Sequence, residues 1–242
     1  MKALDAYLHD HLPLSQSSFW SLLHDYYLAS GMDAWRVALT PCYVTSNPVV
    51  GRCYGELLAD VAVRSVEPLR ILELGTGHGT LSFHVLRHLE RRLGPEASVQ
   101  YVSSDLAPDN VEYCRSHPRL QTFIERGWLD FAVVDAFAPL PVQLQISGET
   151  WTNNSIQGPL VVVGNYFFDG LPMDLWRVEG GEWSEGKVAL RKIADPSKAQ
   201  PESYLWLLKP EWEFEVPQGA LPPMDQHIAQ QWPHPAAASH VL

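Results

Sequence analysis

The stretch ILELGTGHGT, residues 71–80, decides the fold. It sets glycines at the alternate positions 75, 77 and 79 behind a short apolar run, and the helix-like stretch LSFHVLRHLERRLG follows at once. A buried strand, a bare turn and a helix in this order are typical of the first unit of an open α/β sheet, where a ligand approaches the main chain closely. A dinucleotide fingerprint would place its third glycine at Thr80, and no Lys-Ser/Thr pair follows to make a P-loop. Nicotinamide and flavin are therefore the less favoured ligands, and a P-loop is excluded.

Four apolar runs alternate with helical stretches after residue 69. The runs are LRILELG, VQYVSSD, FAVVDAF and PLVVVGNYF, and between the first two Leu81, Val85, Leu89 and Leu93 fall on one helical face. Gly94 and Pro95 end that helix. Alternation of strand and helix predicts an α/β fold with a mainly parallel sheet and right-handed crossovers, a Rossmann-like arrangement.

The flanking sequence divides the chain into three predicted parts. Residues 1–65 form an N-terminal helical cap, since apolar residues recur at helical spacing in SFWSLLHDYYLA and RCYGELLADVAVRS, with an irregular loop at TPCYVTSNPVVG. Residues 66–180 form the α/β core. Residues 181–242 form a β-hairpin-rich extension, from WRVEGGEWSEGKVALRKIA and YLWLLKPEWEFEV, and a Pro-rich tail whose last ten or so residues we expect to be poorly ordered.

Composition narrows the class of partner and the compartment. The net charge of −11 disfavours a nucleic-acid binder, because phosphate contacts rest on Lys and Arg, and it favours a basic partner. Cys42, Cys53 and Cys114 suggest neither a disulfide framework nor a zinc site. No apolar run is long enough to insert in a membrane and no signal or transit peptide is evident, so we expect a cytoplasmic protein. The sequence indicates no oligomeric state.

The pattern E-L-G-x-G-x-G, residues 73–79, resembles motif I of the class I S-adenosylmethionine-dependent methyltransferases. That ligand carries an ammonium and a sulfonium and no phosphate, so a carboxylate suits it better than a helix N-terminus alone. Asp105-Leu106 ends the second run, where an acid can hold both ribose hydroxyls, and Asp135-Ala136 follows the third, where methyltransferases hold the adenine. The predicted cofactor-binding residues are Glu73, Gly75, Thr76, Gly77, Gly79, Asp105, Leu106, Asp135 and Ala136. The simpler alternative is a tight turn without a ligand.

Two further stretches resemble the MidA-type methyltransferases, the family of the mitochondrial complex I assembly arginine methyltransferase. GNYFFDGLPMDLW, residues 164–176, is similar to the family's N-E-x-x-D-A-L-P signature. YVTSNPVVGRCYGELLAD is similar to its F-x-T-S/A-P segment and F-G-x-x-L-A helix, with matches at Thr45, Ser46, Pro48, Tyr54, Gly55 and Leu58. With motif I, the resemblance covers about residues 40–178.

The resemblance implies transfer of a methyl group from S-adenosylmethionine to a protein arginine, giving symmetric dimethylarginine, as in complex I assembly. It implies Asn165 and Asp169 as catalytic residues, and Thr45, Tyr166 and Asp174 as substrate-binding residues. The chain departs from the family at Tyr166, which replaces the signature Glu. It also lacks an I-D-Y-G-like segment, so it is a shortened homologue, or its tail has diverged, or its sheet is incomplete at the C-terminal strands. A eukaryotic member would be mitochondrial.

Two alternatives to arginine methylation stay open. A small-molecule methyltransferase would use Tyr166 in a closed apolar pocket, and a catalytically silent homologue would keep the fold as a binding or assembly module.

The histidines at helical spacing do not indicate a metal site. His84 and His88 stand four apart, but no glutamate adjoins His84, so the H-E-x-x-H pattern is absent and we expect no metal. We expect these histidines to be exposed or capping.

Overall fold

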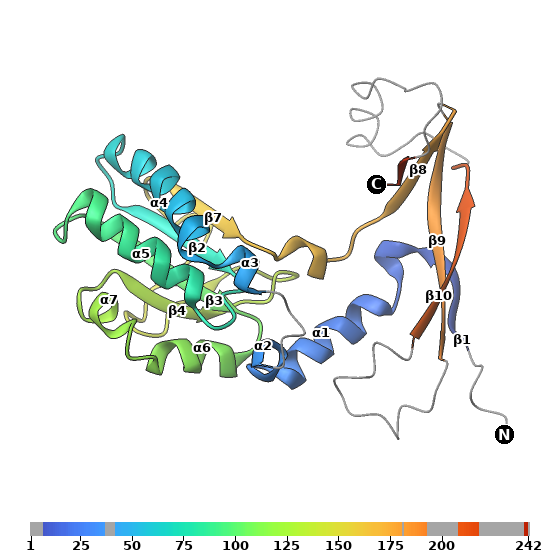
Figure 1. The fold of residues 1–242 in the computed structure, drawn as a ribbon, viewed down its shortest axis with the longest axis horizontal. Helices are drawn as coiled ribbons and strands as arrows, with labels where there is room; N and C mark the ends of the chain where they lie inside the picture. Colours follow the sequence, from blue (N-terminus) through green and yellow to red (C-terminus); the bar gives the residue numbers. More distant parts are fainter. Residues whose placement is uncertain (1–6, 37–41, 181, 193–207, 218–239, 242) are drawn as a thin grey trace. The chain divides into compact units, whose positions relative to one another are not determined.

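The computed structural model describes residues 7–36, 42–180, 182–192, 208–217 and 240–241 (Figure 1). The chain divides into two compact units, each described by itself below. One unit spans Tyr27–Asp169, and the other joins Met1–Tyr26 to Gly170–Leu242. These boundaries differ from those expected at residues 65 and 180, because the N-terminal residues belong with the C-terminal part of the chain.

The unit Tyr27–Asp169 is built on a four-stranded parallel sheet. Its strands are β2 (Leu69–Leu74), β3 (Val99–Asp105), β4 (Leu129–Val133) and β7 (Leu160–Gly164), in the order β4-β3-β2-β7. All three strand pairs are parallel. The mainly parallel sheet predicted from the four apolar runs is thus confirmed, and the carboxyl ends of all four strands lie at one edge of the sheet.

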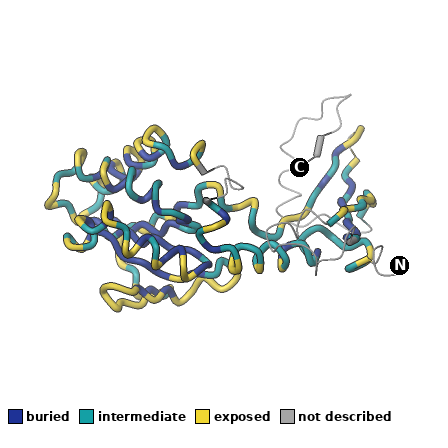
Figure 2. The backbone as a smooth tube through the Cα atoms, turned by 60° about the horizontal axis from the view of Figure 1, so that its bottom comes forward, coloured by how far each residue is buried: buried dark blue, intermediate teal, exposed yellow. Residues whose placement is uncertain are grey.

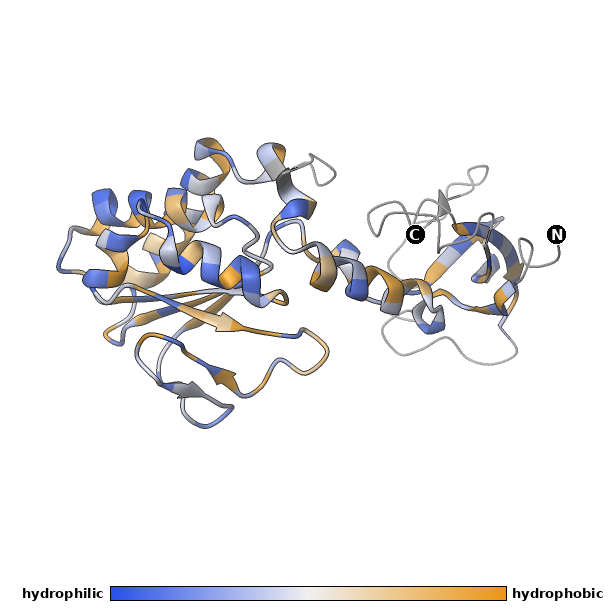
Figure 3. Cartoon of the chain, turned by 90° about the horizontal axis from the view of Figure 1, so that it is seen from below, coloured by the Kyte–Doolittle hydropathy of each residue, from blue (hydrophilic) through white to orange (hydrophobic). Residues whose placement is uncertain are grey.

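Helices cover one face of this sheet. They are α4 (Pro48–Val63), α5 (Thr80–Leu93), α6 (Pro108–Ser116) and α7 (Gln121–Glu125). Ile71, Tyr101 and Phe131 point into this layer and are fully buried with side chains from all four helices. Figure 2 shows the buried residues concentrated along the strands, and Figure 3 shows the hydrophobic residues there, with hydrophilic ones on the outer helix turns.

The opposite face carries a second, smaller core. Leu72, Val102 and Ala132 point to this side, as the alternation of side chains along a strand requires, and pack against Val142 and Trp151. These last two residues belong to the short antiparallel pair β5 (Val142–Gln143) and β6 (Thr150–Trp151). Both faces of the central strands are covered, which explains why their sequences are almost continuously apolar.

Two glycines bring α4 and α5 together. A side chain at Gly51 would overlap the Cβ of His84, and one at Gly55 would lie 2.7 Å from the His88 ring. The spacing of four residues on both helices keeps each glycine opposite its histidine. His84 and His88 are half-buried packing residues at this contact, whereas the sequence led us to expect exposed or capping residues.

The second unit is an antiparallel sheet. It contains β1 (Tyr7–Pro13), β8 (Leu175–Glu179), β9 (Glu182–Lys192), β10 (Leu208–Glu215) and β11 (His240–Val241), in the order β1-β9-β8-β11 with β10 also paired to β9. The predicted hairpin is confirmed by β8 and β9. The helical expectation is wrong for Tyr7–Pro13, which forms β1, because pairing with β9 decides its conformation. Most of the expected disordered tail lies outside the described residues.

The remaining elements are short, apart from one helix. They are η1 (Leu14–Gln16), α1 (Phe19–Ser30), α2 (Asp33–Arg36), α3 (Cys42–Thr45) and η2 (Phe168–Gly170). The prediction of an irregular loop at residues 40–51 is wrong in part, because α3 and the start of α4 lie within this stretch. The side chain of Asn47 caps α4 by accepting hydrogen bonds from the Val49 and Val50 amides. Over the described residues, no helix is both long and apolar enough to span a bilayer.

Candidate functional site

The glycine loop between β2 and α5 needs its glycines for conformation. Gly75, Gly77 and Gly79 have φ angles of 69°, 54° and 73°, all in the left-handed region that side chains disfavour. The loop is held in place from β3, since the Thr76 amide donates to Ser104 O at 2.9 Å. Glycine therefore stands at each of the three alternate positions where the backbone of this loop is left-handed.

Aromatic side chains cover two of these glycines. A Cβ on Gly75 would lie 2.9 Å from Phe167, and one on Gly77 would lie 2.8 Å from the Trp35 ring. Trp35 also contacts His78, with 5.7 Å between ring centroids. The indole Nε1 of Trp35 is buried and has no hydrogen-bond partner. The sides of Gly75 and Gly77 that carry no side chain are thus packed against aromatic rings.

Asp105, at the end of β3, is hydrogen bonded to the loop. Its Oδ2 accepts the Gly77 amide at 2.8 Å, and its Oδ1 accepts the Ala107 amide and Asn110 Nδ2, both at 3.0 Å. Burial raises the pKa of Asp105, and the hydrogen bonds from Ala107, Gly77, Asn110 and Leu106 act in the opposite direction. Oδ1 thus already accepts two bonds, whereas Oδ2 accepts one from Gly77 and keeps a lone pair for a ligand hydroxyl.

Glu73 lies beneath the loop and not on its surface. It is 2% exposed, and its Oε2 accepts hydrogen bonds from Ser82, from Tyr101 at 2.8 Å and from Thr76 at 3.4 Å. Burial raises the pKa of Glu73 despite these three hydroxyl donors. We expected this carboxylate to face the cationic end of the cofactor; in the structure its Oε2 faces a hydroxyl cluster that supports the turn.

Asp135 lies at the same sheet edge as Asp105. The Val134 amide donates to Asp105 O at 3.0 Å, which joins the ends of β3 and β4. Asp135 and Ala136 follow directly and are half-buried, and Asp135 Oδ1 accepts the Phe137 amide at 2.9 Å. Leu106, also half-buried, follows Asp105. The predicted ribose and adenine positions are therefore neighbours at this edge.

A small pocket joins the glycine loop to the end of β7. Its lining residues are Trp35, Thr45, Ser46, Glu73, Gly75, Thr76, His78, Leu81, Asn165 and Tyr166. Asn165 Nδ2 donates to Thr45 O at 2.9 Å, which fixes the amide and leaves Oδ1 as an acceptor. Of the residues predicted for the acceptor, Thr45, Asn165 and Tyr166 thus meet at the loop.

Tyr166 has an unusual backbone conformation. Its φ is 53°, the only positive value among the described residues other than glycine, and its side chain is 46% exposed. For a bulky residue this conformation costs roughly 1–2 kcal/mol. Strain of this kind is concentrated at functional sites. The turn Asn165-Tyr166 is therefore a second indication, beside the loop, that this edge of the sheet is functional.

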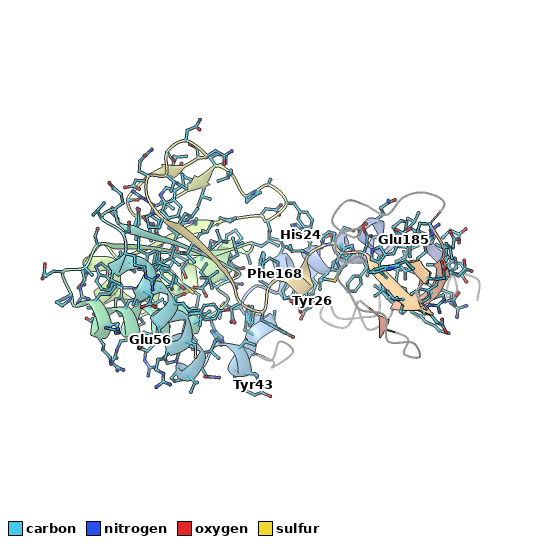
Figure 4. All side chains as sticks on the ribbon, turned by 90° about the horizontal axis from the view of Figure 1, so that it is seen from above. His24, Tyr26, Tyr43, Glu56, Phe168 and Glu185 are labelled. Carbon is cyan, nitrogen blue, oxygen red and sulfur yellow. The ribbon has the colours of Figure 1, made fainter. Side chains whose placement is uncertain are left out.

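The two other acids predicted for the acceptor do not line this pocket. Asp169 is exposed in η2, next to Phe168, which Figure 4 labels. Asp174 belongs to the other unit, where its Oδ1 accepts the Ser15 amide at 3.2 Å. Neither position gives these carboxylates a described contact with Asn165 or Tyr166.

The sequence did not point to three residues at this edge, two of which line the pocket. His78 stands inside the glycine motif, and burial lowers its pKa, so that the neutral ring is favoured. Trp35 comes from α2, far from the motif in sequence, and no pattern marked it. Asn110 was also missed, although an asparagine in the helix after an acidic strand end is well placed to hold that acid.

The residues at this edge suit S-adenosylmethionine. The loop offers glycine main chain flanked by the rings of Trp35 and Phe167, Asp105 offers a carboxylate next to it, and Asp135 offers a second one beyond. In the described part of the chain, no three or more His, Cys, Asp or Glu side chains gather as they would around a metal ion.

Comparison with solved structures supports the fold. Two crystal structures of Burkholderia thailandensis proteins are similar to this chain. One is of a likely methyl transferase bound to S-adenosyl-homocysteine, with a TM-score of 0.51, and the other is of an uncharacterized protein of the same superfamily, with a TM-score of 0.50. Both are 18% identical, and they cover 87% and 91% of this chain but 47% of their own chains. The chain thus spans about half the length of the structures it matches. No curated protein matches it.

Residues 50–237 match a family described as "Putative S-adenosyl-L-methionine-dependent methyltransferase". The match includes the glycine loop, the acids at the ends of β3 and β4, and the Asn165-Tyr166 turn. S-adenosylmethionine is the cofactor of this family. The chain belongs to this family of S-adenosylmethionine-dependent methyltransferases.

Proposed function

We propose that the protein transfers a methyl group from S-adenosylmethionine to a guanidinium nitrogen of a protein, as the MidA-type methyltransferases do. The observation that carries the proposal is the pocket shared by the glycine loop and the Asn165-Tyr166 turn. A nitrogen held at Asn165 would lie beside the loop that binds the cofactor. The bound sulfonium supplies an activated methyl group, so the chain's own task is mainly to align and to exclude water.

Asn165 is the residue best placed to orient the acceptor. Its Nδ2 donates to Thr45 O, so its Oδ1 is left to accept from a donor such as a guanidinium N–H. The nitrogen forms a bond to the methyl carbon as the carbon–sulfur bond breaks, and one proton leaves the nitrogen. Because a guanidinium is protonated at neutral pH, the leaving proton needs an acceptor; Asp169 lies outside the pocket lining but follows Asn165 by four residues, and we propose this exposed carboxylate for that role.

The overall charge supports a basic protein as the partner. A net charge of −11 attracts cationic segments over a longer range than any single contact. The finer assignment, symmetric dimethylation in complex I assembly, follows from the resemblance at residues 40–178. The rival small-molecule acceptor would need a pocket closed by Tyr166, whose side chain is nearly half exposed.

A catalytically silent homologue is the second candidate. Two observations favour it: Tyr166 replaces the carboxylate of the signature, and Phe167 and Trp35 cover Gly75 and Gly77. Such a protein would keep the parallel sheet and its fold but would not catalyse methyl transfer. Binding of S-adenosylmethionine followed by methyl transfer separates the two candidates.

The test uses tritiated S-adenosylmethionine and arginine-rich peptides, with products located by mass spectrometry. The proposal expects label on arginine, lost in Asn165→Ala and raised in Tyr166→Glu, which restores the carboxylate. Label on lysine or on small molecules alone would contradict the arginine assignment. Binding without any transfer, in the parent chain and in Tyr166→Glu, would favour the silent homologue.

A further inference from the structure

A basic groove runs along α4 and α5, on the helical side of the sheet. It has a volume of about 510 Å³ and is lined by Pro48, Val49, Arg52, Phe83, His84, Arg87, His88 and Arg91. A second hollow of about 580 Å³ shares Phe83 and Arg87 with it and adds Glu90, Pro118, Arg119, Thr122 and Phe123. The two hollows together are called the arginine groove below.

Four arginines of the arginine groove have no carboxylate partner. Arg52, Arg87, Arg91 and Arg119 are exposed, and none forms an ion pair with any residue that the structure describes. The guanidinium groups of Arg87 and Arg119 lie 5.7 and 5.8 Å from the centre of the Phe83 ring, on which both stack. In a chain with 28 acids and 17 Lys and Arg, such a cluster is unexpected.

The acids at this surface are already engaged. Glu56, which Figure 4 labels, binds His88 at 3.0 Å and Arg92 at 3.2 Å, and Glu90 binds Arg126 at 2.9 Å. The positive field of the groove is therefore not balanced from within. At His84 burial is the main cause that lowers the pKa, and Arg119 and Arg87 lower it further.

The close packing of α4 on α5 creates this surface. Gly51 and Gly55 seat His84 and His88, which draws Arg52 of α4 towards Arg87 and Arg91 of α5. Clustered like charges repel, so this arrangement does not serve stability. Apolar surface lies among the charges, since Val49 is 65% exposed and Phe83 lines both hollows.

We propose that the arginine groove docks an acidic segment of a partner protein in which carboxylates alternate with apolar side chains. The four free arginines supply the charge complement, and Phe83 and Val49 supply the apolar contact. An acidic peptide is favoured over nucleic acid for two reasons: four arginines are few for a phosphate backbone, and the net charge of −11 repels a long polyanion. The groove is separate from the glycine loop, so the proposal stands apart from methyl transfer.

The test measures binding of a fluorescein-labelled peptide of alternating Glu and Leu to the full chain by fluorescence polarisation. The same peptide with Gln for Glu and a labelled polyuridylate serve as competing probes. We expect saturable binding of the Glu peptide that weakens with added salt, which screens charges. We expect the double reversal Arg87→Glu with Arg91→Glu to weaken it by about tenfold or more.

A matched control separates the groove from general charge. Arg64→Glu with Arg115→Glu changes the net charge equally at exposed arginines outside both hollows, and should leave affinity within about twofold. Val49→Asp, at an exposed position, should weaken binding without loss of the folded circular dichroism spectrum. Two binding results would overturn the proposal: no binding of the Glu peptide, or equal weakening by both double variants. Two other results would assign the groove to a different occupant and overturn it as well: tighter binding of polyuridylate, or a salt-sensitive dimer that the Arg87 and Arg91 reversal abolishes.

Discussion

The carboxylate of Asp105 accepts the amide of Gly77 at 2.8 Å, so that the acid at the end of β3 holds the centre of the glycine loop. The same carboxylate is held by Asn110 and the Ala107 amide. This contact links the two strongest signals in the sequence, the glycine motif and the acid that ends the next strand. The acid therefore supports the loop from the end of the neighbouring strand.

Removal of the Asp105 carboxylate should weaken cofactor binding. Asp105→Ala loses the Gly77 contact and the acceptor for the ribose hydroxyls, and we expect a loss of about 1–3 kcal/mol in S-adenosylhomocysteine affinity. Isothermal titration calorimetry measures it. Asp109→Ala, at the exposed start of α6, is the control and should bind as the parent does. An unchanged affinity in Asp105→Ala would remove Asp105 from the site.

Substitution of Gly77 tests two separate costs. Gly77→Ala must adopt a φ of 54°, which costs about 1–2 kcal/mol, and its Cβ must displace Trp35. Gly127→Ala carries the φ cost alone, because its φ is 77° and nothing lies within 4 Å. In urea unfolding, Gly77→Ala should therefore be the more destabilising of the two, by roughly 1–3 kcal/mol. Trp35→Ala should abolish that excess; persistence of the excess would refute the contact.

Packing of α4 on α5 sets the outcome of Gly55→Ala. An alanine in a helix interior normally gains about 1 kcal/mol over glycine. Here its Cβ would lie 2.7 Å from the His88 ring, and overpacking costs about 1–3 kcal/mol, so we expect net destabilisation. Replacing His88 by Ala in the same chain should reverse the sign. A stabilised single variant, measured by thermal unfolding, would contradict the close helix contact.

The buried Glu73 predicts a pH dependence. Its pKa is raised by burial, so the folded state holds a proton that the unfolded state has lost, and the free energy of unfolding falls as pH rises from the ordinary glutamate pKa through the raised one. Glu73→Gln keeps an acceptor for Ser82 and Tyr101 and should remove that fall. Urea unfolding of both chains across this range measures it. Parallel pH profiles would show that Glu73 is not the titrating group.

The parallel sheet was predictable from sequence because its central strands are buried on both faces. VQYVSSD coincides with β3, and LRILELG contains β2, since contacts on both sides demand apolar residues throughout. The Tyr7–Pro13 strand was not predictable, because YLHDHLP alternates only weakly and gains its conformation from distant β9. The same holds for Trp35 and for the pairing of Gly51 with His84, which are contacts between segments far apart in sequence.

The site itself was partly predictable. The glycines, Asp105 and Asp135 were chosen from their places after strands, and parallel strands bring such places to one edge. The orientation of Glu73 was not predictable, because the hydroxyls that bury it come from Ser82 and Tyr101, on a helix and a neighbouring strand. Asp174 was assigned to the acceptor from its place close to the signature stretch; it belongs to the antiparallel unit, and its role toward the acceptor stays a prediction.

Calorimetric titration of the purified chain with S-adenosylhomocysteine tests the central claim most directly, because the glycine loop, Asp105 and Asp135 are assigned to that ligand. We expect one saturable site with a dissociation constant in the micromolar range, about −8 kcal/mol, and weaker binding in Asp105→Ala. Well-folded protein that binds neither S-adenosylhomocysteine nor S-adenosylmethionine would contradict the account, and would leave the loop as a structural turn packed by Trp35 and Phe167.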